Sequence, residues 1–473
     1  MTSQAISSTV RSTMKSDRRR ARSLPHVLLV NPWIHDFSAY DFWAKPLGLL
    51  GLAAILRSHD YRVSYIDCLD RFHPRDPRRD RIDSTDLPVR CGRGPYRKTP
   101  LPTPASIPDV PRTFSRYGIR PEWFRESLEA LPKPDLILIT SMMTYWYPGI
   151  QETIGHIRGV FPETPIVLGG IYASICTEHA VSVSGADRVI GGQAEGAILD
   201  VAAEYTGFSA SLRFDPELPD THPYPALDLQ SRIPYIPLLT SRGCPFSCVY
   251  CASRFLNPKR TRRTPESVVE EIRFWHRSYE AVDFVLYDDA FLAEAEAHAV
   301  PILEGILNSG MRLRFHTPNA LHIRGITPEI AGLMFGAGFS TLRLGLETAA
   351  AREDGMDRKA TVEEFRSAAS CLRNAGFRKD QVGAYLLAGL PGQSPQTILE
   401  SIEVVHRSGI TPVPAYYSPI PKTALWKEAL QSSRYDLASD PIFTNKAIMP
   451  CQREPFSWEM ISRLKKAARA ESG

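Results

Sequence analysis

Three cysteines lie close together near the middle of the chain and could hold a metal centre. They are Cys244, Cys248 and Cys251, spaced C-x3-C-x2-C within the stretch Thr240-Ser-Arg-Gly-Cys-Pro-Phe-Ser-Cys-Val-Tyr-Cys251. Cysteine thiolates ligate the iron of iron–sulfur clusters, and a cubane cluster usually takes four of them. The next cysteines along the chain, Cys176 and Cys371, are distant. Three thiolates would leave one iron with an open position for a substrate or cofactor.

Two other interpretations of these cysteines exist. A structural zinc site normally closes with four Cys or His ligands, but the nearest histidines, His222 and His276, are well separated from the cysteines in sequence. Three inert buried thiols are the second alternative, and the tight spacing argues against it. An iron–sulfur cluster therefore explains the pattern best.

The cysteine stretch resembles the signature of the radical S-adenosylmethionine (radical SAM) superfamily, including an aromatic residue, Tyr250, before the last cysteine. The resemblance implies that Cys244, Cys248 and Cys251 hold a 4Fe–4S cluster whose free iron is chelated by S-adenosylmethionine. One electron from the reduced cluster would cleave the sulfonium and give a 5′-deoxyadenosyl radical. It also implies an external electron donor such as flavodoxin or ferredoxin.

The C-terminal half alternates apolar runs with helical patterns, so the cysteine stretch follows the first of a series of parallel strands. Strands are expected at 236–240, 282–286, 313–316, 341–346, 382–387 and 413–418, and helices from Pro265 and near 293–308, 328–336, 362–375 and 395–408. About six strand–helix repeats predict a partial (βα)6 barrel over 236–425. Reacting groups in such barrels come from the carboxyl ends of the strands.

Polar residues do follow these strands. Asp288 and Asp289 follow the second strand. A buried carboxylate at this position needs a partner, such as the ammonium of S-adenosylmethionine. Alternatively, one of the two aspartates could cap the helix that follows. The resemblance implies further contacts with S-adenosylmethionine from Tyr250, Glu347, Gly383 and Gly389, the last two in the motif Gly383–Gln393.

Other polar residues at the strand ends have two interpretations each. His316, Thr317 and Asn319 could bind substrate or cofactor, or could serve turn chemistry. Arg343 and Glu347 could instead form a salt bridge. The sequence identifies no catalytic residue.

The N-terminal half predicts a second parallel sheet. Strands are expected at 26–31, 62–67, 135–140, 165–169 and 187–190, with helices at 46–56, 149–160 and 195–205. The fold class is therefore α/β, with a doubly wound, Rossmann-like sheet over 25–210 that precedes the barrel. Ligands of such sheets bind at the carboxyl ends of the strands.

The order of loops at those ends resembles the cobalamin-binding domain that precedes the radical SAM domain in one large subfamily. The resemblance implies cobalamin contacts at six positions: Asn31, Ser141, Gly169, Gly170, Gly192 and Glu195. The D-x-H-x-x-G motif is absent, which implies that no histidine lies below the corrin, and Trp33 stands where a small residue is frequent. The alternative is a domain of this fold that does not bind cobalamin.

Four further segments complete the domain organisation: a disordered basic leader at 1–24, an irregular insert at 71–133 within the first domain, a linker at 211–235 and a small C-terminal cap at 426–473. The insert is rich in Pro and Arg, and we expect it to help shape the cofactor or substrate cavity. Cys68, Cys91 and Cys176 could form a second cluster, or could be small hydrophobic residues.

Composition limits the class of protein. The 473 residues carry a net charge of +4, too small to argue for nucleic acid or an anionic membrane as partner. Eight cysteines do not make a secreted disulfide framework, and no apolar run is long enough to span a bilayer. A cytoplasmic location is expected.

The sequence therefore predicts a radical SAM enzyme that acts on a small molecule, with cobalamin-dependent methylation as the leading reaction. A radical rearrangement, cyclisation or bond cleavage without functional cobalamin is the first alternative. A tRNA methylthiotransferase is a further one, but it needs a second cysteine triad. A non-catalytic iron–sulfur electron-transfer or binding protein is the alternative from another class.

Overall fold

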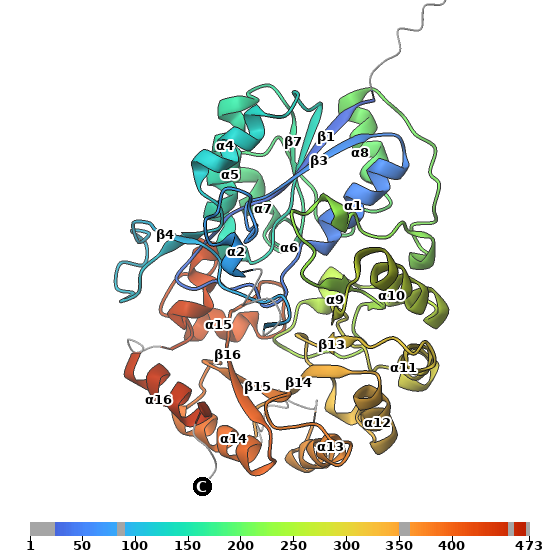
Figure 1. Cartoon of the computed structure of the whole chain (residues 1–473). Coiled ribbons are helices and arrows are strands. Elements are labelled where there is room, and N and C mark those ends of the chain that lie inside the picture. Colours follow the sequence, from blue (N-terminus) through green and yellow to red (C-terminus); the bar gives the residue numbers. More distant parts are fainter. Residues whose placement is uncertain (1–23, 83–89, 350–359, 453–457, 470–473) are drawn as a thin grey trace, which may run out of the picture.

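Two parallel sheets, one in each half of the chain, form the frame of the molecule (Figure 1). The computed structural model describes residues 24–82, 90–349, 360–452 and 458–469. The expected basic leader, apart from residue 24, lies outside the described residues. None of the described helices combines the length and apolar character that a membrane span requires.

The N-terminal sheet has the order β3-β1-β6-β7-β8, and every neighbouring pair is parallel. Its strands are β1 (His26–Asn31), β3 (Arg62–Asp67), β6 (Leu136–Ile139), β7 (Ile166–Leu168) and β8 (Arg188–Val189). Successive residues of a strand point to opposite faces. Val27 and Leu29 therefore pack toward α1 (Leu47–Ser58) and α8 (Ile198–Thr206), while Leu28 and Val30 pack on the other face.

Helices α4 (Pro121–Glu129), α5 (Tyr147–Val160), α6 (Ile171–Ile175) and α7 (Thr177–Val183) follow along the chain. Phe124 of α4 and Ile154 of α5 belong to the core of the second face. Both faces of the sheet are thus covered by helices, which confirms the doubly wound fold predicted from the sequence.

The insert at 71–133 contains several short regular elements among its described residues. It contains the short helix α2 (Arg79–Arg81), the strands β4 (Lys98–Pro100) and β5 (Ser115–Tyr117), and α4. These strands join β2 (Ile34–Asp36) in an antiparallel sheet of order β2-β5-β4. Proline at its first position and one buried face explain why α4 forms.

The small antiparallel sheet is fastened to α5 through one carboxylate. Glu152 Oε2 lies 2.6 Å from His35 Nε2 on β2 and accepts a hydrogen bond of 2.7 Å from Arg116 Nε on β5. Burial alone would raise the pKa of Glu152, but the hydrogen bonds from His35 and Arg116 outweigh it and lower the pKa from 4.5 to about 2. The ionised form is therefore favoured by folding.

Acid should weaken this attachment. A carboxyl group with a lowered folded-state pKa stabilises the fold above its unfolded pKa, and this stabilisation is lost as pH falls from 4.5 toward about 2. We expect Glu152→Gln to cost on the order of 2 kcal/mol at neutral pH and little near pH 2. Urea unfolding at several pH values measures this, with the exposed Glu129→Gln on α4 as control. An equal cost at both ends of the pH range would contradict it.

The C-terminal sheet has the order β16-β15-β14-β13-β12-β9, again with all pairs parallel. Its strands are β9 (Ile236–Leu238), β12 (Asp283–Leu286), β13 (Arg314–His316), β14 (Phe339–Glu347), β15 (Val382–Ala388) and β16 (Thr411–Tyr416). Since the strands follow chain order, the sheet is the partial barrel predicted from the sequence.

The barrel helices are α10 (Pro265–Tyr279), α11 (Ala299–Asn308), α12 (Pro328–Gly336), α13 (Val362–Asn374) and α14 (Pro395–Arg407). Residues of all five lie in the same apolar core as the strands. Four of these helices begin at a Ser or Thr whose side chain accepts an N-terminal backbone hydrogen bond. The exception is α11, which begins at residue 299 rather than near 293 because a 3-10 turn, Ala295–Ala297, precedes it.

The segment after residue 425 contacts both halves of the molecule. Helix α15 (Trp426–Ser432) and helix α16 (Trp458–Arg469) lie on the barrel side, and Leu464 belongs to the barrel core. Between them, Ile442 and Ile448 pack with Phe37 and Phe114 of the N-terminal half. The segment therefore connects the halves as well as covering the barrel.

Candidate functional site

The cysteine loop leaves the barrel at the end of β9. Strand β10 (Ser241–Arg242) pairs with β11 (Thr261–Arg262) and closes the loop at its base. Gly243 has φ +82, and a Cβ there would lie 3.2 Å from Arg260 Cα and from the Asn257 carbonyl oxygen, so the position favours glycine. The Cys251 N–H donates to the Cys248 carbonyl over 3.0 Å.

The loop brings the three thiols together. Surrounding protein raises the pKa of Cys251, although its side chain is exposed on one side, and the nearby Cys248, Asp289 and Cys244 act in the same direction. The three thiols are therefore close enough to act on one another, as ligands of one cluster must be.

The two aspartates after β12 have different surroundings. Asp288 is buried, and it accepts hydrogen bonds from Thr240 Oγ1 at 2.5 Å and Ser241 Oγ at 2.6 Å. Burial raises its pKa despite these bonds. Asp289 is half-buried, and its Oδ2 accepts from Gly243 N and Asn257 Nδ2, each at 3.1 Å. Asp288 therefore holds the base of the loop, while Asp289 lies beside the thiols.

A cavity of about 440 Å³ lies between the two halves of the molecule. The N-terminal half contributes the start of α1, the ends of β6 and β7, and the loops 169–174 and 190–195. The barrel contributes Leu239, Arg242, Leu256, Asn257, Tyr287 and Asp289. The carboxyl ends of the two parallel sheets therefore share one mostly apolar cavity, which is where ligands of both folds bind.

Glycines leave room for a large ligand in this cavity. A Cβ added to Gly48 or Gly192 would have nothing within 4 Å, and one added to Gly169 would meet only the Ile190 carbonyl oxygen at 3.7 Å. Gly170 differs, because its φ is +94 and a Cβ would lie 2.3 Å from the Ser141 carbonyl oxygen. The cavity therefore fits a broad, mainly apolar group such as a corrin, and the thiols and Asp289 fit a cluster with a chelating amino acid.

One ion pair joins the two halves at the cavity. Arg242 Nη2, on β10, lies 2.5 Å from Glu195 Oε1, and both side chains are mostly buried. Burial would raise the pKa of Glu195, but Arg242 outweighs it and holds the pKa below its usual value. The pair fixes the cysteine loop relative to the glycine loops.

Not every residue expected at the site reaches the cavity. Asn31 Nδ2 donates to Asp67 Oδ1 at 2.7 Å, and Ser141 Oγ donates to the Gly169 carbonyl at 2.6 Å, so both organise loops within the N-terminal half. Gly383 lies near the amino end of β15, where Arg343 Nη1 would be 3.1 Å from its Cβ. That end of the strand faces away from the expected cofactor position.

Three more of the expected positions surround the barrel mouth. Gly389 has φ +92 and packs against Met449 of the C-terminal segment, while Tyr250 packs into a neighbouring apolar cluster. Glu347 is buried at the carboxyl end of β14 with φ +65, a conformation that costs a non-glycine residue about 1–3 kcal/mol. Strain of this kind concentrates at functional sites.

The scattered cysteines do not assemble into a second cluster. Cys68 and Cys176 belong to the helix-covered core of the N-terminal half, whereas Cys91 lies beside Trp43 and Val285 in the barrel. Asn319 Nδ2 donates to the carbonyl oxygens of Tyr287 and Asp288, which makes it a residue of the turn.

Sequence reasoning missed several residues of the cavity, namely Gly48, Arg242, Asn257 and Tyr287. Arg242 and Asn257 flank the cysteine loop, so their proximity to the cluster position was available from the sequence. The contribution of α1 was not, because it depends on how the two halves are stacked.

Two proteins with similar sequences are named as methyltransferases, and two others, from Rubrivivax gelatinosus and Cereibacter sphaeroides, as anaerobic magnesium-protoporphyrin IX monomethyl ester cyclases. An uncharacterized methyltransferase of Pyrococcus horikoshii is 23% identical over 330 residues, covering 63% of this chain and 70% of that protein. Cytidylyl-2-hydroxyethylphosphonate methyltransferase of Streptomyces wedmorensis is 20% identical over 485 residues, covering 88% and 83%.

The fold is shared with a solved structure of a methyltransferase. The radical S-adenosylmethionine methyltransferase TsrM of Kitasatospora setae, with tryptophan and a SAM analog bound, has a TM-score of 0.61 at 16% identity. The match covers 90% of this chain and 83% of that one. A second TsrM structure, with cobalamin and a [4Fe-4S] cluster bound, has a TM-score of 0.60 at 18% identity and covers 90% and 85%.

Family models match both halves of the chain. The B12 binding domain matches residues 114–202, and the radical SAM superfamily matches residues 238–405. The cofactors are accordingly a 4Fe–4S cluster, S-adenosylmethionine and cobalamin, in agreement with the cysteine loop and the shared cavity. The chain therefore carries a radical SAM domain with a B12-binding domain ahead of it.

Proposed function

We propose that this enzyme is a cobalamin-dependent methyltransferase that methylates a carbon or phosphorus atom of a small molecule. The observation that carries the proposal is the single cavity lined by both domains, with the glycine loops on one side and Asp289 on the other. A methyl group carried by a corrin and a substrate activated in the barrel must meet in one space, and this cavity provides it.

Each part of the chain has a role in this reaction. Cys244, Cys248 and Cys251 would hold the cluster, Asp289 would bind the ammonium of S-adenosylmethionine, and the glycine loops would hold the corrin. When bound, these groups supply reductive cleavage of the sulfonium and a methyl group for transfer. The ion pair between Glu195 and Arg242 fixes the position of the corrin-binding loops relative to the cysteine loop.

The apolar wall of the cavity excludes water from the reaction. Leu49, Leu138 and Val167 line it on the side of the B12-binding domain, and Leu239 and Leu256 line it on the barrel side. A dry cavity protects reactive species from solvent and strengthens electrostatic contacts such as the one expected at Asp289.

Asp289 and Asp288 should respond differently to the same substitution. Asp289→Asn removes a charge beside the thiols, so we expect the KM for S-adenosylmethionine to rise roughly 10- to 100-fold, with little change in stability. Asp288→Asn removes an acceptor for the hydroxyls of Thr240 and Ser241, so we expect a loss of about 1–3 kcal/mol in unfolding free energy. Steady-state kinetics and chemical denaturation of both variants measure this. The reverse assignment of the two effects would contradict it.

The cluster needs one electron from outside, because the chain supplies only the site that holds it. We expect a low-potential donor such as flavodoxin or ferredoxin, and a reducing cytoplasm suits both the donor and the exposed Cys251. Turnover with each donor, compared with dithionite, would test this.

The decisive experiment uses the full chain, reconstituted anaerobically with iron, sulfide and hydroxocobalamin. After removal of free corrin, the visible spectrum should retain the bands of bound cobalamin. Adding S-adenosylmethionine and a reductant should convert these bands to those of methylcobalamin and release S-adenosylhomocysteine.

Other outcomes identify the alternatives. A protein that retains no corrin but still forms 5′-deoxyadenosine would be a radical enzyme that rearranges, cyclises or cleaves its substrate. A protein that consumes no S-adenosylmethionine at all would be an electron-transfer or binding protein. Either result would overturn the proposed methyl transfer.

A further inference from the structure

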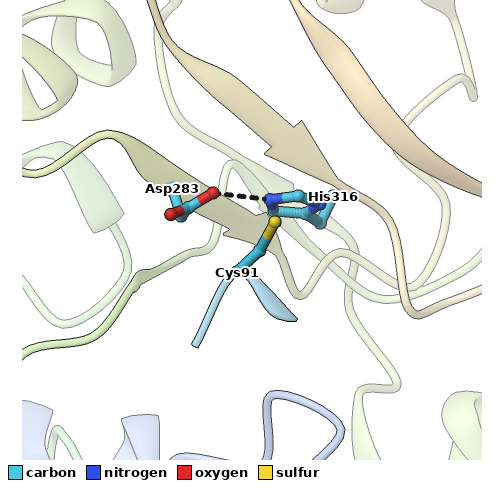
Figure 2. A group of neighbouring side chains, drawn as sticks. All are labelled: Cys91, Asp283 and His316. Carbon is cyan, nitrogen blue, oxygen red and sulfur yellow. Dashed lines mark hydrogen bonds and ion pairs between the residues drawn. The ribbon is translucent and has the colours of Figure 1, made fainter. Parts of the chain in front are cut away.

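A second group of metal-binding residue types lies inside the barrel, away from the cysteine loop. The group consists of Cys91 from the insert, Asp283 from β12 and His316 from β13, and their ligand atoms all lie within 4.8 Å of one another. Figure 2 shows the Cys91 thiol directed at the His316 ring, with Asp283 reaching the same ring from the neighbouring strand. Asp283 and His316 are buried, and Cys91 is half-buried.

The location separates this group from the shared cavity. Asp283 is the first residue of β12, whereas Tyr287 and Asp289, which line the cavity, follow the last residue of that strand. Asp283 therefore lies at the amino end of β12, while His316, the last residue of β13, is level with Val285 of β12. None of its three members lines the cavity described above.

The three side chains offer the ligand types that zinc prefers. Zinc binds a thiolate, an imidazole nitrogen and a carboxylate oxygen at about 2.0–2.3 Å, so an ion among these three atoms needs only small side-chain rotations to reach them all. The thiolate also disfavours hard cations such as Mg²⁺ and Ca²⁺, which prefer oxygen. Three protein ligands leave one tetrahedral position for water or a substrate atom.

Neighbouring residues already hold these ligands as they are held around protein-bound metals. His316 Nδ1 lies 3.1 Å from Thr341 Oγ1, and Asp283 accepts from Arg314 Nε at 2.7 Å and Nη2 at 2.6 Å. Metal-binding histidines almost always donate their other ring N–H to such a partner. His316 Nε2 lies 3.0 Å from Asp283 Oδ1, so a cation that replaced the proton between these two atoms would bind both.

The backbone that positions the Cys91 thiol is strained. Cys91 has φ +49, and Trp43, whose indole N–H donates to the Cys91 carbonyl at 2.7 Å, has φ +67. Trp43 also stacks on the His316 ring, with centroids 4.6 Å apart. Two non-glycine residues in the left-handed region cost about 1–3 kcal/mol each, and the contacts that maintain them place Cys91 against His316.

From this arrangement we propose that Cys91, Asp283 and His316 form a zinc site that fastens the insert of the B12-binding domain to the barrel interior. The site is separate from the iron–sulfur cluster, and its presence does not depend on the methyl-transfer proposal. The insert is thereby tied to strands β12 and β13 from inside the barrel.

The test uses the full chain with Cys244, Cys248 and Cys251 all changed to serine, because empty cluster thiols would themselves bind zinc. After chelation, this protein should take up about one zinc per chain, and Co²⁺ should give thiolate charge-transfer and d–d absorption. Adding Cys91→Ser should remove the Co²⁺ bands and weaken zinc binding at least about tenfold, since a thiolate ligand is lost. Adding Cys371→Ser on α13 instead should change neither the Co²⁺ absorption bands nor the affinity for zinc.

The unfolding temperature, measured with and without zinc, tests the proposal even if a variant folds poorly. Zinc should raise the unfolding temperature of the parent protein and of the Cys371→Ser control, because a ligand that binds the folded state stabilises it, but not that of Cys91→Ser. Equal zinc uptake and equal stabilisation with and without Cys91 would overturn the proposal. So would a parent protein that binds no zinc.

Discussion

Cys248→Ser is expected to abolish reductive cleavage of S-adenosylmethionine, a loss of more than roughly a thousandfold, because the cluster then has only two thiolate anchors. Cys248 is the middle cysteine of a loop that the structure closes at β10 and β11 and packs against Asp289. Serine keeps the size of the side chain but is a poor ligand for iron. The iron content of the reconstituted protein and the yield of 5′-deoxyadenosine measure the effect.

A matched control separates loss of the cluster from loss of the fold. Cys371→Ser changes a half-buried thiol on α13, outside the cysteine loop, and should leave iron content and turnover unchanged. If Cys248→Ser retained a full complement of iron and its activity, the cysteine loop would not be the cluster site.

Gly48→Phe is expected to weaken cobalamin binding by at least about tenfold, or ~1.4 kcal/mol. Gly48 lies on α1 and lines the cavity, and a Cβ there meets nothing within 4 Å. The phenyl ring would therefore occupy space that the corrin needs. The helix itself tolerates the change, because phenylalanine is a better helix former than glycine. Retention of corrin after gel filtration and the visible spectrum of the reconstituted protein give the result.

Gly159→Phe on α5 provides the control for this substitution. Gly159 is also helical, is exposed, and has nothing within 4 Å of its Cβ, but it does not line the cavity. Both variants should unfold at similar urea concentrations. Full corrin retention by Gly48→Phe would mean that cobalamin binds elsewhere.

Apolar runs and regular alternation were enough to predict both parallel sheets. Val27 to Val30 are apolar on both faces, which is typical of a strand covered by helices on each side. The sheet β2-β5-β4 was missed because its strands have only three residues each and carry charged side chains such as Arg116. Their pairing depends on contacts across the chain, such as Ile34 with Tyr117.

The sequence pointed to the three cysteines of the candidate site, but it could not give the surroundings of the residues near them. Two adjacent aspartates look alike in sequence, and only the fold turns Asp288 toward Thr240 and Asp289 toward Gly243. Gly383 lies near the amino end of β15, away from the shared cavity, and its contact with S-adenosylmethionine stays a prediction. The group around Cys91 was not predicted, since its members come from an insert and two separate strands.

The C-terminal segment sets an order for the assembly of the enzyme during translation. Asn445 Nδ2 donates to Asp36 Oδ1 at 2.9 Å, although the two residues are 409 positions apart in the chain. The Tyr147 hydroxyl donates to Asp440 Oδ2 at 3.0 Å and joins the same two parts of the chain. Domains generally fold as they emerge from the ribosome, N-terminal first. The B12-binding half can thus complete its sheet before residues 440–445, and the contacts that they make with it, exist.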